Sequence, residues 1–161
     1  MTNGERHPAR RDGARILIAS DHAGFALKQV LGAELRGAGF AVDDLGPTTD
    51  ASTDYADLAH PLARAVSAGE AERGVLLCGT GLGMSYAANR WPGVRAAVAW
   101  SPEIAALARQ HNDANVLVLP ARFVSEEQGR AILRTWLDTP FEGGRHERRV
   151  AKIERAVGRD A

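Results

Sequence analysis

The residues best suited to chemistry lie in one short stretch, CGTGLG at 78–83, which begins with the chain's only cysteine. Its three glycines allow a tight turn that exposes backbone N–H groups, and such a turn can bind an anion. A helix beginning at Leu82 would add the positive end of its dipole at the same place. These surroundings also favour the ionised form of a thiol. The stretch therefore predicts an anion site beside a nucleophile or base, Cys78.

Two common glycine motifs do not fit this turn. A dinucleotide fingerprint would need its third glycine at 84 instead of 83, and an ATP-binding loop would need a following Gly-Lys-Ser/Thr. A small nest of N–H groups for one oxyanion remains, and so does an ordinary tight turn between a strand and a helix. Cys78 likewise has a plain alternative, as a small buried apolar residue at a strand end.

Polar side chains at two other places could join this chemistry. His111-Asn112-Asp113 stands at the end of an expected helix, and Asp21-His22 follows the first expected strand. The alternative for His111 is a cap on the helix dipole, and Asp21 could merely cap the next helix. Histidine titrates near neutrality, which suits proton transfer.

Arg145 and Arg149 are four residues apart, so on a helix they share one face, where two guanidinium groups could grip a phosphate. The alternative is a solvated charged helix. No pair of histidines or carboxylates has the spacing typical of metal ligands, so we expect no metal.

The hydrophobic pattern indicates the elements that must hold these residues. Apolar runs predict strands at 15–20, 40–45, 74–78, 94–100 and 115–119, and helical spacing predicts helices at 25–37, 55–67, 82–90, 102–111, 126–137 and 145–158. Pro61 implies either a kink in the second helix or a later start for it. Strands alternating with helices predict an α/β fold, a doubly wound, Rossmann-like sheet of five parallel strands with helices on both faces. Ligands of such sheets bind at the carboxyl ends of the strands, which here carry 21–22, 78–83, 100–101 and 120–122.

Composition limits the function classes. The 20 basic and 20 acidic side chains cancel, which argues against nucleic-acid or membrane binding, and no apolar run is long enough for a membrane span. One cysteine excludes an internal disulfide and suits a cytoplasmic protein. Residues 1–14 are polar and predict a disordered tail, so that 15–161 would form a single domain including a C-terminal helix.

Six motifs together resemble the type B ribose-5-phosphate isomerases, a family that includes galactose-6-phosphate isomerase subunits and allose-6-phosphate isomerases. They are DHAG (21–24), DY (54–55), CGTGLG (78–83), AAN (87–89), HNDANV (111–116) and GGRHERRV (143–150). The resemblance runs from Arg15 to Ala156 and so covers nearly the whole chain.

The resemblance implies an isomerase that interconverts an aldose phosphate and a ketose phosphate, with no metal or organic cofactor. Cys78 matches the base that moves a proton between C2 and C1, and His111 matches the residue that opens the sugar ring. Some members place serine at the first position and use a nearby glutamate, but residues 82–85 here hold no carboxylate. Thr80 would help the turn to hold the enediolate oxygen. Matches to substrate contacts are Asp21, His22, Tyr55, Gly79, Thr80, Gly81, Leu82, Gly83, Asn112, Arg122, Arg145 and Arg149.

The resemblance also implies a homodimer or tetramer with pockets shared between subunits, in which the terminal helix would reach the partner's pocket. Ribose 5-phosphate and ribulose 5-phosphate are the expected substrates. One alternative keeps the chemistry but takes a four- or six-carbon sugar phosphate, through a pocket reshaped by Trp100 or the loop at 47–53. Another is a non-catalytic sugar-phosphate sensor, which would usually lack the base or the acid.

Overall fold

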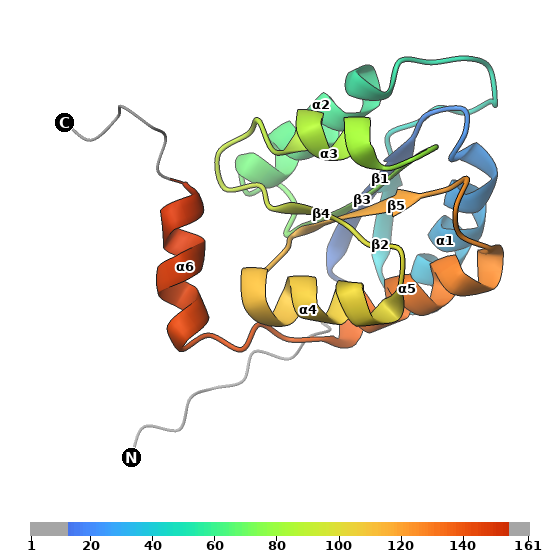
Figure 1. The fold of residues 1–161 in the computed structure, drawn as a ribbon. Coiled ribbons are helices and arrows are strands. Elements are labelled where there is room, and N and C mark those ends of the chain that lie inside the picture. Colours follow the sequence, from blue (N-terminus) through green and yellow to red (C-terminus); the bar gives the residue numbers. More distant parts are fainter. Residues whose placement is uncertain (1–12, 155–161) are drawn as a thin grey trace.

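Five parallel strands form one central sheet in the computed structural model, which describes residues 13–154. The strands are β1 (Arg15–Ser20), β2 (Ala41–Asp44), β3 (Arg73–Cys78), β4 (Ala96–Val98) and β5 (Val116–Pro120). The helices are α1 (Phe25–Gly37), α2 (Tyr55–Ser67), α3 (Leu82–Ala88), α4 (Pro102–Asn112), α5 (Glu126–Asp138) and α6 (Arg145–Ile153). The strand order is β2-β1-β3-β5-β4, as Figure 1 shows. The predicted doubly wound sheet is confirmed.

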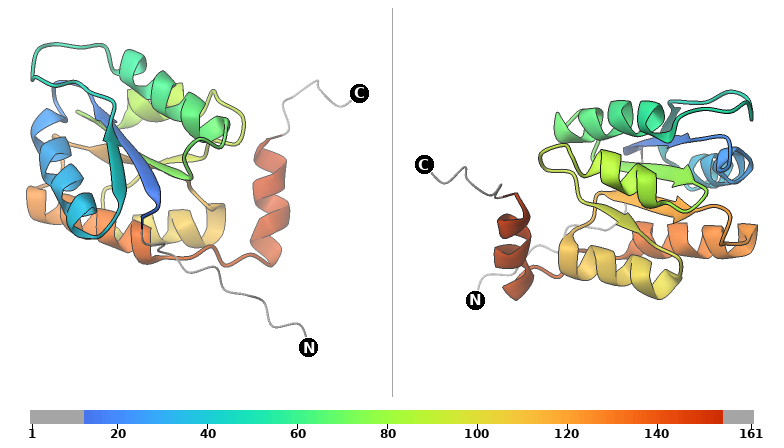
Figure 2. Two further views of the ribbon diagram at one scale, coloured as in Figure 1. Left: turned by 180° about the vertical axis from the view of Figure 1, so that it is seen from behind. Right: turned by 45° about the horizontal axis from the view of Figure 1, so that its top comes forward.

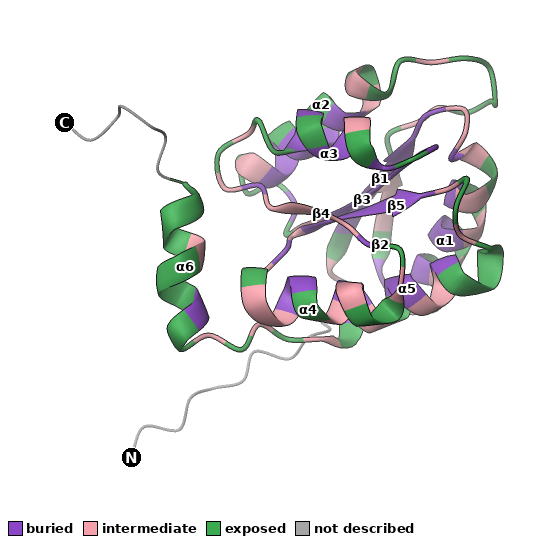
Figure 3. Cartoon of the chain, viewed as in Figure 1, coloured by how far each residue is buried: buried purple, intermediate pink, exposed green. Residues whose placement is uncertain are grey.

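Alternate residues of the central strands face two separate cores, because successive side chains of a strand point to opposite faces. Leu17 and Leu76 belong to the core under α2 and α3, whereas Ile18 and Val75 belong to the core under α1, α4 and α5. The turned views in Figure 2 show these helices as layers on either side of the sheet. In Figure 3 the central strands are almost wholly buried, and α6 is almost wholly exposed.

The point at which the strand order reverses lies between β1 and β3. From β1 the chain moves outward to β2, and it then returns to the other side of β1 to form β3. Ligands of open parallel sheets bind beyond the carboxyl ends of the strands at such a point. Asp21 and the turn at 79–81 directly follow the two strands that flank it.

Several element boundaries differ from the predicted ones. β4 covers only Ala96–Val98 instead of 94–100, because it is an edge strand that pairs with β5 alone and the Arg95 amide is taken by the Asn115 side chain. α3 ends at Ala88 instead of 90, where a turn begins. α2 starts at Tyr55 with Pro61 inside it, so the later start is excluded.

The termini extend past the described part. Residues 1–12 of the tail expected at 1–14 lie outside it, while Gly13 donates a backbone hydrogen bond to Gly39 and Ala14 accepts one from Ala41. The last helix was predicted over 145–158, and residues 155–158 of that prediction also lie outside the described residues. Within residues 13–154, every helix is too short or too polar to cross a membrane.

Candidate active site

Asp21 and Cys78 lie side by side at the carboxyl edge of the sheet. The Asp21 amide donates to the carbonyl of Leu77, 3.0 Å away, and its carboxylate accepts the amide of Gly24 at 3.1 Å. Both side chains are over nine-tenths buried. Gly24 permits this close approach, because a Cβ there would lie only 2.7 Å from that of Leu77. The two side chains are therefore fixed by backbone geometry.

Two N–H groups of the turn after β3 are used within the turn, one by the thiol and one by the Thr80 hydroxyl. Gly81, whose φ is +78°, donates its amide to Cys78 Sγ at 3.2 Å, a contact that stabilises a thiolate. The Leu82 amide is taken by Thr80 Oγ1 at 3.2 Å. Within residues 13–154, no hydrogen bond uses the amides of Gly79, Thr80 or Gly83. The anion nest predicted over 79–83 is thus narrower, with three available donors.

His22 and Arg122 add two further anion-binding groups at this edge. The Thr53 amide donates to His22 Nδ1 at 3.3 Å, so a neutral His22 carries its proton on Nε2 and can donate it to a ligand. The Arg122 amide donates to the carbonyl of Gly79, and its side chain lies over that glycine, where a Cβ would be 3.3 Å from a guanidinium nitrogen. The edge therefore favours a phosphate or an oxyanion.

Tyr55 forms a wall beside the turn. Its ring lies so close to Gly83 that a Cβ on that residue would be 2.6 Å from two ring atoms. The Tyr55 and Leu82 side chains are each nearly half exposed, at 46% and 49%. The structure thus brings one set of predicted residues together at the carboxyl edge of the sheet: Asp21, His22, Tyr55, 78–83 and Arg122.

The remaining predicted residues lie at the opposite edge of the sheet. His111 and Asn112 end α4, and Gly74, at the start of β3, donates to the carbonyl of Asn115 just beyond them. β3 spans six residues, so at about 3.3 Å per residue roughly 16 Å of strand separates this edge from Cys78. Arg145 and Arg149 belong to α6, which packs against the end of α4. One chain therefore does not bring Cys78 and His111 together.

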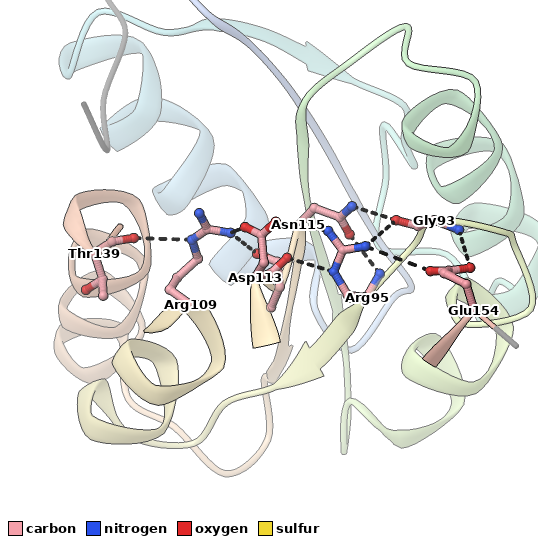
Figure 4. Close-up of polar contacts among 8 residues, drawn as sticks. Gly93, Arg95, Arg109, Asp113, Asn115, Thr139 and Glu154 are labelled. Carbon is pink, nitrogen blue, oxygen red and sulfur yellow. Dashed lines mark hydrogen bonds and ion pairs between the residues drawn. The ribbon is translucent and has the colours of Figure 1, made fainter. Parts of the chain in front are cut away.

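A charged network fixes α6 to the body of the protein, as Figure 4 shows. Glu154 accepts the amide of Gly93 at 2.9 Å and lies 3.8 Å from the guanidinium of Arg95. Arg95 in turn contacts the carboxylate of Asp113 at 3.2 Å, and Arg109 contacts that same carboxylate at 2.8 Å. Asp113 has a left-handed backbone with φ of 48°, which ends α4 immediately after His111 and Asn112. Of these contacts, only Arg109–Asp113 has a signal in the sequence, because the two residues are four positions apart on a helix.

His111, Glu142 and His146 form a cluster that sequence reasoning missed, although Glu142 and His146 are four residues apart. Their potential ligand atoms lie within 4.8 Å of one another. However, the two imidazole rings are stacked, with centroids 4.4 Å apart and planes within 10°. Imidazole lone pairs lie in the ring plane, so those of two nearly parallel rings do not converge on one ion. Holding a metal would require the stack to break.

Comparison with known proteins assigns the chain to a family. The family model described as Ribose/Galactose Isomerase matches residues 16–153. Ribose-5-phosphate isomerase B of Escherichia coli (strain K12) is 45% identical over 139 residues, which are 86% of this chain and 93% of that protein. The D-erythrulose-4-phosphate isomerase of Pectobacterium atrosepticum is 40% identical over 139 residues, which are 86% and 91% of the two chains.

A solved structure agrees with this match. Ribose-5-phosphate isomerase B of Mycoplasma genitalium, with bound ribulose-5-phosphate, superimposes with a TM-score of 0.86 at 46% identity. The match covers 90% of this chain and 97% of that one. The protein therefore belongs to the ribose/galactose isomerase family, and it is an aldose–ketose isomerase of the ribose-5-phosphate isomerase B type.

Proposed function

We propose that the protein interconverts ribose 5-phosphate and ribulose 5-phosphate at sites that are each built from two copies of the chain. The observation that carries the proposal is the carboxyl edge itself. A buried thiol that accepts the Gly81 amide lies beside three available N–H donors and the cation of Arg122. These groups suit a reaction that removes a carbon-bound proton and holds the resulting oxyanion.

Cys78 acts as the base in this proposal. Its thiolate takes the proton from C2 of the open-chain aldose, the electron pair of that C–H bond forms the C1–C2 double bond, and the carbonyl oxygen becomes an enediolate oxygen. The O2 hydroxyl then passes its proton to O1, a carbonyl forms at C2, and the electron pair of the double bond takes the proton back from Cys78 at C1, which gives the ketose and restores the thiolate. The free amides of Gly79, Thr80 and Gly83, with the Thr80 hydroxyl, stabilise the enediolate oxygens.

His111 of the second copy opens the sugar ring. Its imidazolium gives a proton to the ring oxygen while the bond from that oxygen to C1 breaks, and the C1 hydroxyl releases its proton to solvent as the carbonyl forms. Histidine suits this role because it exchanges protons near neutral pH. Asn112, next to it and exposed, would contact a sugar hydroxyl.

The phosphate is held by cations from both copies. Arg145 and Arg149 are exposed and have no ion pair among the described residues, so their guanidinium groups are available to a ligand. We propose that they grip the phosphate together with His22 and Arg122 of the other copy. Binding energy at this remote group positions C1 and C2 over the base.

Two features favour a second copy over a site within one chain. First, the catalytic pair is split between opposite edges of the sheet. Second, large apolar side chains around the carboxyl edge are exposed, and a partner would cover them: Tyr55, Leu82, Tyr86, Trp100 and Phe123. The hollow of about 760 Å³ between α6 and β4 has Asn112 on its wall and does not reach Cys78, as expected if neither edge is a complete site alone.

Mixing two inactive variants tests both the chemistry and the sharing. Cys78→Ala and His111→Ala should each be inactive with ribose 5-phosphate. In a mixed dimer one site carries both substitutions, while the other takes its thiol and its imidazole from unaltered positions. Random exchange should therefore restore about one quarter of the parental activity. If the mixture stays inactive after subunit exchange has been verified by mass spectrometry, the shared site is wrong.

The choice of sugar has a second candidate, because a relative acts on D-erythrulose 4-phosphate. We propose the pentose phosphate first, since the E. coli relative and the M. genitalium structure are ribose-5-phosphate isomerases. Measuring kcat/KM for four-, five- and six-carbon aldose phosphates decides between them. A higher value for the four- or six-carbon sugar would overturn the choice, and binding without turnover of any of them would indicate a sensor.

A further inference from the structure

His146 is the point at which α6 meets the rest of the protein. It is 5% exposed and is the one buried residue of this helix, whose first five residues are all polar or charged. What it packs against is the imidazole of His111, at the end of α4. In Figure 1, α6 stands beside the end of α4, away from the sheet. Burial of a single histidine is unusual for a helix contact, where an aliphatic side chain would gain more hydrophobic free energy.

Glu142 lies beside this histidine. Its carboxylate lies 3.4 Å from His146 Nε2, and its backbone amide donates to the carbonyl of Gln110 at 3.1 Å. A carboxylate this close to one ring nitrogen favours one orientation of an imidazole. Glu142 is thus attached by its backbone to the last turn of α4, and its carboxylate lies beside the ring that covers His111.

The surroundings of His146 disfavour its protonated form. Burial is the main cause that lowers its pKa, followed by the nearby charges of His111, Arg145 and, more weakly, Arg149, while Glu142 acts in the opposite direction. His111 faces it from α4, Glu142 from the segment before α6, and the two arginines from α6 itself. Two stacked imidazolium rings would repel each other, so the stack is more stable when the two rings are not both protonated.

We propose that His146, oriented by Glu142, is a positioning residue for His111. Its flat ring fixes the plane of the His111 imidazole, so that a ring nitrogen of His111 reaches the sugar ring oxygen in the shared site. This inference rests on the proposed function and adds a residue to it. It concerns ring opening only, because Cys78 moves the carbon-bound proton without His111.

The test compares a cyclic sugar with one that has no ring to open. A four-carbon aldose 4-phosphate cannot close a five-membered ring, because its C4 oxygen is esterified. His146→Ala should reduce kcat for ribose 5-phosphate by roughly tenfold or more and leave kcat for the aldotetrose 4-phosphate within about twofold. His146→Phe, which keeps a flat ring, should recover most of the loss, and Arg148→Ala, on the exposed side of α6, serves as the matched control.

Nuclear magnetic resonance of the histidine ring protons gives a readout that does not depend on activity. The ring-current shift of His111 should be lost in His146→Ala and kept in His146→Phe. Equal losses of kcat for both sugars, or an unchanged kcat for ribose 5-phosphate, would overturn the inference while the parent remains an active isomerase. A parent that isomerises neither sugar would instead overturn the proposed function, and with it this role.

Discussion

The two edges of the sheet hold their functional residues in opposite ways. At the carboxyl edge, Asp21 and Cys78 are buried, and short turns at the strand ends fix them through backbone hydrogen bonds. At the opposite edge, where the strands begin and which we call the amino edge, His111 is half-buried and Arg145 and Arg149 are exposed. The helix that carries these arginines is held by one stacked ring and by the contacts of Glu154.

This difference indicates a division of labour. A base that removes a carbon-bound proton needs a fixed, partly dry environment, and buried strand ends provide it. Groups that grip a phosphate must reach a ligand from outside, and exposed arginines on a helix can do so. This difference agrees with the proposal that the amino edge of one copy meets the carboxyl edge of another.

The largest effect is expected from removing the thiol at the carboxyl edge. Cys78→Ala should lower kcat by roughly 10³-fold or more, because the reaction loses its base. Cys78→Ser should be nearly as inactive, since residues 82–85 hold no carboxylate to take its place. Steady-state kinetics with circular dichroism as a folding control measures this. Activity within a few-fold of the parent would remove Cys78 as the base.

A smaller effect, mainly on KM, is expected from the arginines of the amino edge. Arg149→Ala should raise KM by roughly 10- to 100-fold, which corresponds to the loss of about 1.5–3 kcal/mol from a charge-assisted hydrogen bond. Arg145→Lys should recover only part of the affinity lost in Arg145→Ala, because an ammonium cannot bind a phosphate with two parallel N–H groups. Losses confined to kcat would contradict a phosphate-binding role.

A modest effect is expected when the far end of α6 is loosened. Glu154→Gln removes a partly exposed ion pair with Arg95, which is worth less than about 1 kcal/mol. We therefore expect a change of up to a few-fold in kcat/KM for ribose 5-phosphate and no change in the buried carboxyl edge. Hydrogen exchange measured by mass spectrometry should show faster exchange in α6 alone. Faster exchange in β1 or β3 would mean that the two edges are not independent.

The smallest effect is a pH dependence of stability that originates at the amino edge. The pKa of His146 is lowered from its ordinary 6.5, mainly by burial, so below that pH the unfolded chain takes up a proton that the folded protein resists. The free energy of unfolding should therefore fall as pH drops below about 6.5, and this part of the fall should be absent in His146→Phe. Urea unfolding at a series of pH values measures it. Identical pH dependence in both proteins would show that His146 does not titrate in this way.

Much of the carboxyl edge could be predicted from the sequence because each of its parts is local. Apolar runs gave the strands, the glycines of 78–83 gave the turn, and the rule for parallel sheets brought Asp21 and Cys78 to one edge. Even there, the sequence could not tell which amides stay free. That depends on the Cys78 sulfur and the Thr80 hydroxyl, which each take one.

The amino edge was predictable only as separate pieces. Arg145 and Arg149 share a helix face by their spacing, but nothing local indicates that His146 between them stacks on a histidine 35 positions away. The same is true of Arg95, which reaches both Asp113 and Glu154. Such contacts depend on where helices dock, and docking follows from packing of the whole chain.

The sequence by itself determined the class of sheet, the position of the thiol at a strand end and, through its six motifs, the family. Hydrophobic periodicity and turn chemistry are local, so they can be read without the fold. Only the tertiary structure decided which amides of the turn stay free and that His146 of α6 stacks on His111. The reason is that such contacts depend on where turns and helices dock. The placement of Cys78 and His111 at opposite edges, by contrast, follows from the order of the elements, because a helix between two parallel strands must run back along the sheet.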